Sequence, residues 1–229
     1  MKNTKLETIL HELQEIGDTR NLSGMRRFGI QTDHAFGISI PKLASIAKVI
    51  GKDHALSLDL WATGYHEARI LAGMIADPSQ TSSALLESWV LDFNSWDVCD
   101  QICGRLIVWT PYAREKALSW ALREEEFVRR AGYTLMACLA LRKHAYPDHW
   151  YLSFLDHLLL HAGDRRNFVW KAEHWALRQI GKRSAGLMLS ALEVSRNLSS
   201  SENPQRRKVG KTALRELEAK LGRVLKRAL

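Results

Sequence analysis

Phe127-Val-Arg-Arg-Ala131 recurs further along the chain as Phe168-Val-Trp-Lys-Ala172. Trp120-Ala-Leu-Arg123 likewise recurs as Trp175-Ala-Leu-Arg178, and His66-Glu-Ala-Arg-Ile70 resembles the first pair of segments. Self-similarity of this kind is the sequence signature of a protein built from repeated structural units. The recurring segments therefore decide the architecture that we expect.

Superposing these segments places Arg69, Arg130 and Lys171 at one equivalent helix position. Asp100 lies midway between Arg69 and Arg130 in the sequence, so it falls in an intervening repeat. A period of roughly 30–40 residues with two helices in each repeat is typical of stacked helix pairs of the HEAT or armadillo kind. Such stacking lines the second helices along one concave face, which we expect to carry these four residues.

Helical patterning extends over nearly the whole chain, and each of the five prolines falls between apolar-periodic blocks. Phe36-Gly-Ile-Ser-Ile40 alternates like a strand, but no partner follows across a tight turn, so no hairpin is predicted. The polar stretch Asn197–Pro204 is predicted to be a loop. We expect an all-α protein, an α-solenoid of stacked antiparallel helix pairs, with helices over Leu6–Ile16, Pro41–Ile50, Ala55–Thr63, Glu67–Ala76, Thr81–Val90, Trp96–Val108, Ala113–Leu122, Glu126–Ala140, Asp148–His161, Asn167–Ile180, Ala185–Val194 and Gln205–Lys226.

The composition is that of a folded protein, with 46% hydrophobic and 25% charged residues among 229. We expect one domain over residues 1–229, with a basic helical segment from about residue 204. No apolar stretch approaches the ~20 residues of a membrane span, and no secretory signal is visible. The odd count of three cysteines, without C-x-x-C spacing, argues for reduced thiols. These features exclude secreted, membrane and disulfide-framework classes and predict a cytoplasmic protein.

The net charge of +8 comes entirely from the C-terminal part of the chain. Residues 1–180 hold 21 basic and 21 acidic side chains, whereas residues 181–229 hold 12 basic and 4 acidic ones. A basic end indicates a polyanionic partner, most commonly nucleic acid. A solvated helix that only keeps the protein soluble explains the same charge, so both interpretations remain open.

Aromatic side chains accompany the charged residues of the predicted concave face. Trp96 lies one turn before Asp100, and Trp175 lies one turn after Lys171. Rings that contact bases or sugars, interleaved with cations that hold phosphates, suit a nucleic-acid surface. A carboxylate there repels the backbone, unless it stabilises positive charge in a ligand or a transition state. A cationic alkylated purine or an oxocarbenium-like sugar would supply that charge, and aromatic faces would add cation–π attraction.

Structural explanations of the same residues remain open. Large aromatic side chains in an all-α protein usually belong to the core. Asp97 or Asp100 could serve as a helix N-terminal charge behind Ser95, which has the residue type of an N-cap. Arg130 could pair with Glu126 one turn back on its own helix.

Five segments resemble the AlkD-type DNA alkylation repair proteins, which are HEAT-like-repeat DNA glycosylases. The resemblance extends over about Arg26 to Arg183. It implies a C-shaped stack of helix pairs and excision of positively charged N3- or N7-alkylated purines, with the damaged base left stacked in the duplex. The segments are Arg27-Phe-Gly-Ile30, Gly37-Ile-Ser-Ile-Pro-Lys-Leu43, Leu60-Trp-Ala-Thr-Gly-Tyr-His-Glu-Ala-Arg69, Ser95-Trp-Asp-Val-Cys-Asp100 and Lys171-Ala-Glu-His-Trp-Ala-Leu-Arg-Gln-Ile-Gly181.

The resemblance also assigns roles to single residues. The Trp-Asp-x-x-Asp segment of active members matches Trp96 to Asp100, which gives Asp100 the role of the catalytic carboxylate. Arg130 matches the arginine that follows, and Trp175 matches the second active tryptophan. Two positions depart from the pattern, because active members often carry tryptophan where this chain has Ser95 and an apolar residue where it has Cys99.

The expected activity is therefore monofunctional N-glycosylase action on cationic alkylpurines in double-stranded DNA. Trp96 and Trp175 would flank the lesion, Asp100 would stabilise the sugar cation and position water, and Arg130 would hold a phosphate. We expect the side chains of these four residues to be accessible on one concave surface. Further contacts to the DNA backbone are expected from Arg69, Arg129, Lys171, Lys182 and Arg183.

No cofactor is expected, because the positive charge of the lesion already makes the base a good leaving group, and a monomer is expected. The alternative is a non-catalytic HEAT-like scaffold that binds a DNA structure or a protein.

Other chemistry has weak support. His157 and His161 are one helical turn apart but lack the glutamate of H-E-x-x-H and a third ligand, so no metal site is predicted. Cys99 and Cys103 share a helix face and are expected in the core.

Overall fold

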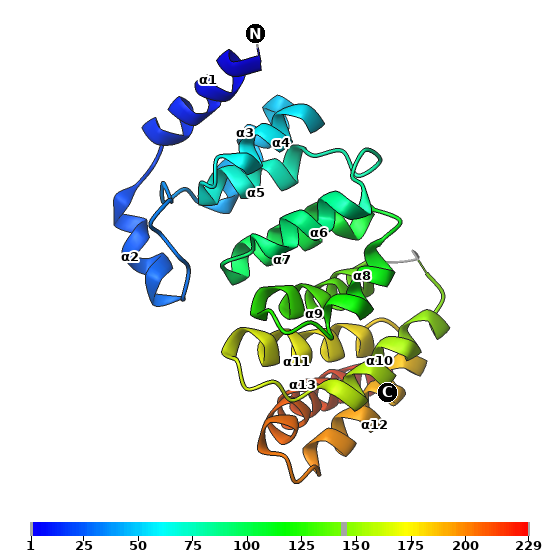
Figure 1. The fold of residues 1–229 in the computed structure, drawn as a ribbon. Helices are drawn as coiled ribbons and strands as arrows, with labels where there is room; N and C mark the ends of the chain where they lie inside the picture. Colours follow the sequence, from blue (N-terminus) through cyan, green and yellow to red (C-terminus); the bar gives the residue numbers. More distant parts are fainter. Residues whose placement is uncertain (1, 143–145, 229) are drawn as a thin grey trace. The chain divides into compact units, whose positions relative to one another are not determined.

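The computed structural model describes residues 2–142 and 146–228, and these residues form helices without any strand (Figure 1). The chain divides into two compact units, residues 1–110 and 111–229. The first unit contains α1 (Lys2–Glu15), α2 (Thr19–Arg27), α3 (Ile40–Ile50), α4 (His54–Ala62), α5 (His66–Ile75), α6 (Ser83–Leu91), α7 (Trp96–Arg105) and the 3₁₀ turn η1 (Ile107–Trp109). The second contains α8 (Ala113–Trp120), α9 (Glu126–Leu141), α10 (His149–His161), α11 (Asn167–Gly181), α12 (Ala185–Ser199) and α13 (Pro204–Ala228).

All twelve helices expected from the sequence are present, which confirms the all-α class. The structure adds α2, which the apolar pattern could not predict because none of its residues is buried. The prediction of a loop over Asn197–Pro204 is wrong at its start, since α12 continues to Ser199. The side chain of Leu198 is fully buried, so the last turn of α12 contributes to the core. The expectation of a single domain concerns the association of the two units and stays a prediction.

In the first unit, α5 is the central helix, with α3, α4 and α7 packed against it. The rings of Trp61 on α4 and Trp89 on α6 stack at 4.0 Å and fill the space between these helices. Both tryptophans are buried, and Leu60 of α4 and Leu71 of α5 are fully enclosed. Burial of rings of this size supplies much of the apolar area that holds such helices together.

The strand-like stretch 36–40 makes no strand and is bound instead to α5 by one side chain. Glu67 is fully buried, and its carboxylate accepts the backbone N–H groups of Phe36 at 2.8 Å, Gly37 at 2.7 Å and Ile38 at 3.1 Å. Gly37 has φ 79°, and a Cβ there would lie 2.2 Å from the carbonyl oxygen of Asp18. Only glycine fits a backbone that combines positive φ with so close an approach.

In the second unit, α8 pairs with α9, α10 lies against α11 and α12 pairs with α13. The second helices of these pairs lie side by side, because α11 packs against both α9 and α13, as Figure 1 shows for α9 and α11. Gly132 on α9 allows close packing, since a Cβ there would lie 2.3 Å from the backbone nitrogen of Ala121 after α8. Side chains of successive pairs are thus brought onto neighbouring helices.

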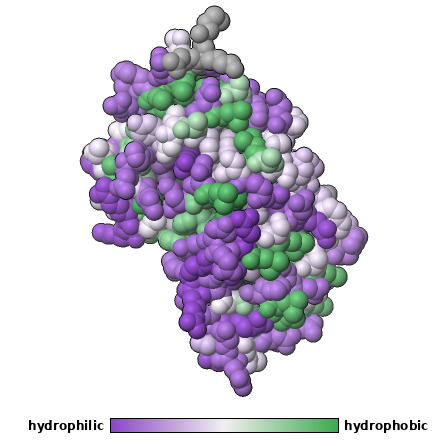
Figure 2. All heavy atoms as spheres, in the orientation of Figure 1, coloured by the Kyte–Doolittle hydropathy of each residue, from purple (hydrophilic) through white to green (hydrophobic). Residues whose placement is uncertain are grey.

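None of the helices in the described residues is both long enough and apolar enough to cross a membrane. On the face drawn in Figure 2, apolar residues form separate patches among hydrophilic ones.

Candidate functional site

Helix α7 carries the Trp-Asp-x-x-Asp segment, and its first turn is held by Asp97. The Oδ1 atom of Asp97 accepts the backbone N–H of Val98 at 3.0 Å and the hydroxyl of Ser95 at 2.8 Å. Ser95 occupies the N-cap position, as its residue type indicates, but its side chain makes no capping bond to the backbone. The sequence left open whether Asp97 or Asp100 is the negative charge at the N-terminus of this helix. The structure assigns that role to Asp97.

Asp97 also contacts the neighbouring helix, because Nε2 of His66 on α5 lies 2.9 Å from its Oδ2 atom. The side chains of His66 and Asp97 are 5% and 12% exposed. Burial works to raise the pKa of Asp97, but the hydrogen bond and charge of His66 outweigh it, and the pKa lies below its usual value. The pair connects the first turns of α5 and α7.

Trp96 and Asp100 lie one turn apart on α7, and both side chains are partly exposed. Trp96 is therefore not enclosed in the helix-pair core, unlike Trp61, Trp89 and Trp120. Its indole N–H donates to the carbonyl of Phe28 at 3.0 Å, just beyond α2. Cys99 and Cys103, in contrast, are fully buried, as expected for small core residues.

Arg69 lies on α5, the helix packed beside α7. Its guanidinium donates to the carbonyl of Asp92 at 3.0 Å and lies 5.3 Å from the ring centroid of Trp61. Its Nε atom is buried without a hydrogen-bond partner. The side chain is thus largely engaged within the first unit and is not a freely mobile cation.

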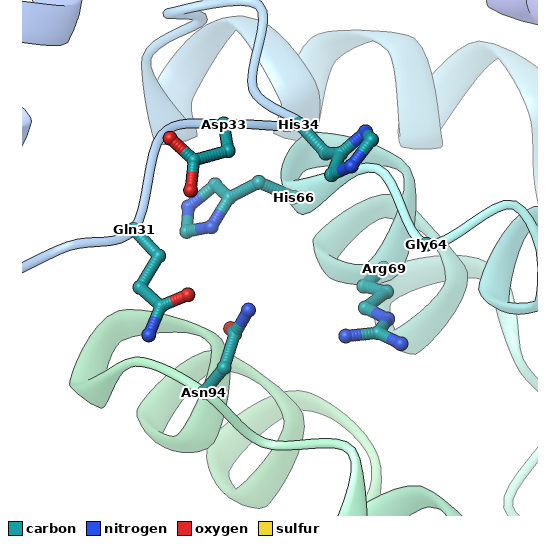
Figure 3. A pocket seen from close by; sticks show the side chains of 7 residues that line it. All are labelled: Gln31, Asp33, His34, Gly64, His66, Arg69 and Asn94. Atoms are coloured by element: carbon teal, nitrogen blue, oxygen red, sulfur yellow. The ribbon is translucent and has the colours of Figure 1, made fainter.

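A polar pocket of about 80 Å³ lies next to Arg69 and His66. In Figure 3 the side chains of Gln31, Asp33 and Asn94 lie around the ring of His66. The volume suits a few water molecules or one small polar group. The full lining is Gln31, Asp33, His34, Gly64, His66, Arg69 and Asn94.

In the second unit, Arg130 on α9 is only 6% exposed. The expectation that its side chain is accessible is therefore wrong. The physical reason is that its Nη1 atom donates to the carbonyl of Phe168 at 2.6 Å, at the start of α11. Its neighbour Arg129 donates to the carbonyl of Arg123 at 2.6 Å and pairs with Asp164 at 3.2 Å. Both arginines connect α9 to the segment around the start of α11.

Helix α11 presents Lys171 exposed and Trp175 partly exposed, one turn apart. The two cations at its C-terminal end have internal partners. Lys182 forms an ion pair with Glu216 of α13, whereas Arg183 donates to the carbonyls of Arg142 and Tyr146 at 2.8 and 2.7 Å. Lys171 is thus the cation of this helix that is most available to a ligand.

Glu173 on α11 is a residue that the sequence did not single out. It is fully buried and accepts the backbone N–H groups of Gly163 at 2.9 Å and Asp164 at 3.2 Å. Burial raises its pKa to about 7, although the two N–H groups oppose this shift. No sequence pattern around Glu173 predicts this contact. The contact orders the backbone at Gly163 and Asp164, and the side chain of Asp164 binds Arg129.

The described residues contain no group of three side chains able to hold a metal ion. The rings of His157 and His161 lie 4.7 Å apart, centroid to centroid. Burial lowers the pKa of His157 to about 4, so this ring is neutral at pH 7. His157 is therefore part of the packing of α10, whereas His161 is exposed.

The candidate residues thus fall into two sets, one in each unit. Neighbouring helices α5 and α7 carry Arg69, Trp96 and Asp100, and neighbouring helices α9 and α11 carry Arg129, Arg130, Lys171 and Trp175.

Residues 9–221 match the family model described as DNA alkylation repair enzyme. The chain belongs to this family. The resemblance read from the sequence is thereby confirmed.

The fold of this DNA alkylation repair family member is also seen in a solved structure. That structure is described as belonging to a new family of proteins related to the HEAT-like repeat DNA glycosylases with affinity for branched DNA structures. The TM-score is 0.80 at 20% sequence identity, over 95% of this chain and 94% of that chain. The HEAT-like repeat architecture is therefore confirmed. No curated protein matches the sequence.

Proposed function

We propose that this DNA alkylation repair family member is a monofunctional glycosylase that excises positively charged N3- or N7-alkylated purines from duplex DNA. The observation that carries the proposal is the pairing of Trp96 with Asp100 on one face of α7, with both side chains partly exposed. A ring and a carboxylate one turn apart offer two kinds of attraction to one cationic group, from the π face and from the negative charge.

Asp100 acts on the sugar of the lesion nucleotide. As the N-glycosidic bond breaks, its electron pair passes to the cationic purine, which leaves as a neutral base. The positive charge that develops on the sugar is stabilised by the carboxylate of Asp100. Water then adds to C1′ and releases its proton to solvent, which leaves an abasic site and the free alkylated base. Trp96 contacts the lesion nucleotide through its exposed ring surface, and Trp175 on α11 offers a second partly exposed ring to the DNA.

The cations serve two purposes in this proposal. Lys171 is exposed and contacts the DNA backbone, and Arg69 adds a partly buried positive charge beside α7. Arg129, Lys182 and Arg183 act mainly within the protein, since each is bound to a carboxylate or to backbone carbonyls. Arg130 orders the start of α11 through the carbonyl of Phe168 and adds its positive charge to the field that attracts a phosphate.

A second candidate function is non-catalytic binding of branched DNA. It is favoured by the structure with affinity for branched DNA, which shares the fold of this chain. It is also favoured by Ser95, because this side chain is fully buried at a position where active members often carry a tryptophan. The carboxylate of Asp100 separates the two candidates, since a pure DNA binder gains nothing from negative charge near phosphates.

The decisive experiment is single-turnover release of labelled base from duplex DNA that contains N7-methylguanine. Asp100→Asn keeps the shape of the side chain but removes its charge, so excision should fall by roughly 10²–10³-fold while DNA affinity stays equal or rises. Asp156→Asn is the matched control, because Asp156 is an exposed carboxylate on α10. Equal rates for Asp100→Asn and wild type, or no release at all, would leave branched-DNA binding as the function, to be measured with a three-way junction.

A further inference from the structure

Helix α13 has two sides of different character. Its buried side consists of Val209, Ala213 and Leu217, packed on α11 and α12. At 100° per residue, the opposite side carries cations one to five turns apart. These are Lys208, Lys211, Arg215 and Lys226, all of which are exposed.

The two carboxylates of α13 are used in ion pairs with other helices. Glu216 binds Arg178 and Lys182 of α11. Burial favours a higher pKa for Glu216, but the hydrogen bonds of Lys182 and Arg178 outweigh it and lower the pKa. Glu218 lies on the outer face, as far from its centre as Lys208 and Lys226 are, and is 3.8 Å from Arg196 of α12. The carboxylate of Glu218 is thus paired with a cation of α12, and the four exposed cations of the outer face outnumber it, so the face keeps a net positive charge.

This face adjoins the candidate site within the second unit. The ammonium group of Lys208 lies 3.8 Å from the ring centroid of Trp170 on α11. Trp170 directly precedes Lys171, the exposed cation of that helix. The cations of α13 thus continue the positive surface of α11 onto the next helix.

We propose that Lys211, Arg215 and Lys226, with Lys208 at one end, bind phosphate groups of a duplex and so extend the DNA contact beyond the lesion. This rests on the DNA binding in the proposed function, although not on excision. From residue 208 to residue 226 the helix rises ~27 Å, which matches about 8 base pairs of duplex. The line of cations is long enough to follow a DNA backbone.

The same face does not suit a membrane surface. A helix that lies in a bilayer interface needs large apolar side chains beside its cations. Among the described residues of the outer face, those between the cations are Glu218 and Gly222, neither of which has a large apolar side chain. A helix that served only solubility would intersperse both signs of charge, whereas here the carboxylates are drawn into contacts with α11 and α12.

The test compares two double variants that each lose two positive charges. Lys211→Gln/Arg215→Gln removes cations of the outer face of α13, and Lys42→Gln/Lys48→Gln removes exposed cations of α3. Glutamine retains helix propensity, so both variants should fold. Binding to an undamaged duplex of about 30 base pairs is measured over a range of salt concentrations.

We expect the α13 variant to flatten the log–log salt slope by about two units, and the α3 variant to leave it unchanged. Equal slopes for the α13 variant and wild type would overturn the proposal, as would equal losses in both variants. Binding to phosphatidylserine vesicles that depends on Lys211 and Arg215, without a change on DNA, would replace DNA by a membrane. Base release from N7-methylguanine is measured separately at saturating protein. Failure of the α13 proposal and failure of the glycosylase proposal can therefore be distinguished.

Discussion

His66 and Asp97 form a buried contact between two neighbouring helices, with Nε2 of the first 2.9 Å from Oδ2 of the second. The same carboxylate holds the N–H of Val98 in the first turn of α7. Trp96 and Asp100 lie on that helix, directly before Asp97 and less than one turn after it. The position of the proposed carboxylate therefore depends on a residue pair that does not itself face the ligand.

Asp97→Asn should lower the free energy of unfolding by about 2 kcal/mol near pH 7, because the amide replaces the charged acceptor of the buried hydrogen bond with His66. The pKa of Asp97 is lowered in the folded protein, so its contribution is present above the unfolded pKa and is lost as pH falls through the folded one. The difference between variant and wild type should therefore shrink below about pH 4. Urea unfolding at neutral and acidic pH measures both effects. Asp156→Asn serves as the control, and an equal change in both variants would argue against the pair.

The helices could be predicted because apolar periodicity depends on residues close in sequence. The pattern therefore predicts that Trp96 and Asp100 share one face of a helix. It does not predict α2, because none of the residues of α2 is buried. The side chain of Asp18, which caps α2 by accepting the N–H of Arg20, was the available signal. The partners of Arg129 and Lys182 lie 35 and 34 residues away. Such contacts depend on how helices pack, so cations that the sequence assigned to DNA are bound within the protein.

Glu173→Gln should flatten the pH dependence of stability. Burial raises the pKa of Glu173 from 4.5 to about 7, so folding favours the protonated form. This contribution is fully present below the unfolded pKa and is lost as pH rises through about 7. Wild type should lose about 3 kcal/mol over this range, whereas the amide, which does not titrate, should not. Thermal or urea unfolding at several pH values between these limits gives the comparison. Parallel curves for both proteins would show that the pKa of Glu173 does not change on folding.

Lys171→Gln should weaken duplex binding for all sequences alike and flatten the log–log salt slope by about one unit. Arg183→Gln should act differently, because its guanidinium binds the carbonyls of Ala140, Arg142 and Tyr146. We expect that variant to lose stability while its salt slope stays at the wild-type value. Binding isotherms and unfolding curves on both variants distinguish the two roles. A reduced slope for Arg183→Gln would place this residue at the DNA backbone.

Gly132→Ala should destabilise the second unit by about 1–3 kcal/mol or more, because the added methyl group would lie 2.3 Å from the backbone nitrogen of Ala121. Gly222→Ala is the matched control, since nothing lies within 4 Å of a Cβ at that helical position. Alanine there should raise stability by up to about 1 kcal/mol. Calorimetric unfolding of both variants checks the contrast. Similar effects of the two substitutions would mean that α8 and α9 can separate without cost.

Because Glu67 alone binds the three amides of residues 36–38, we expect this segment to open locally while the helices of the first unit stay folded. The carboxylate of Glu67 is the shared acceptor for the amides of Phe36, Gly37 and Ile38, so these three protons lose protection together when one side chain withdraws. In hydrogen exchange the three amides should form a single group with one common opening free energy. Exchange of these three amides ahead of the amides of α5 would show that the connection between α2 and α3 opens while α5 stays folded.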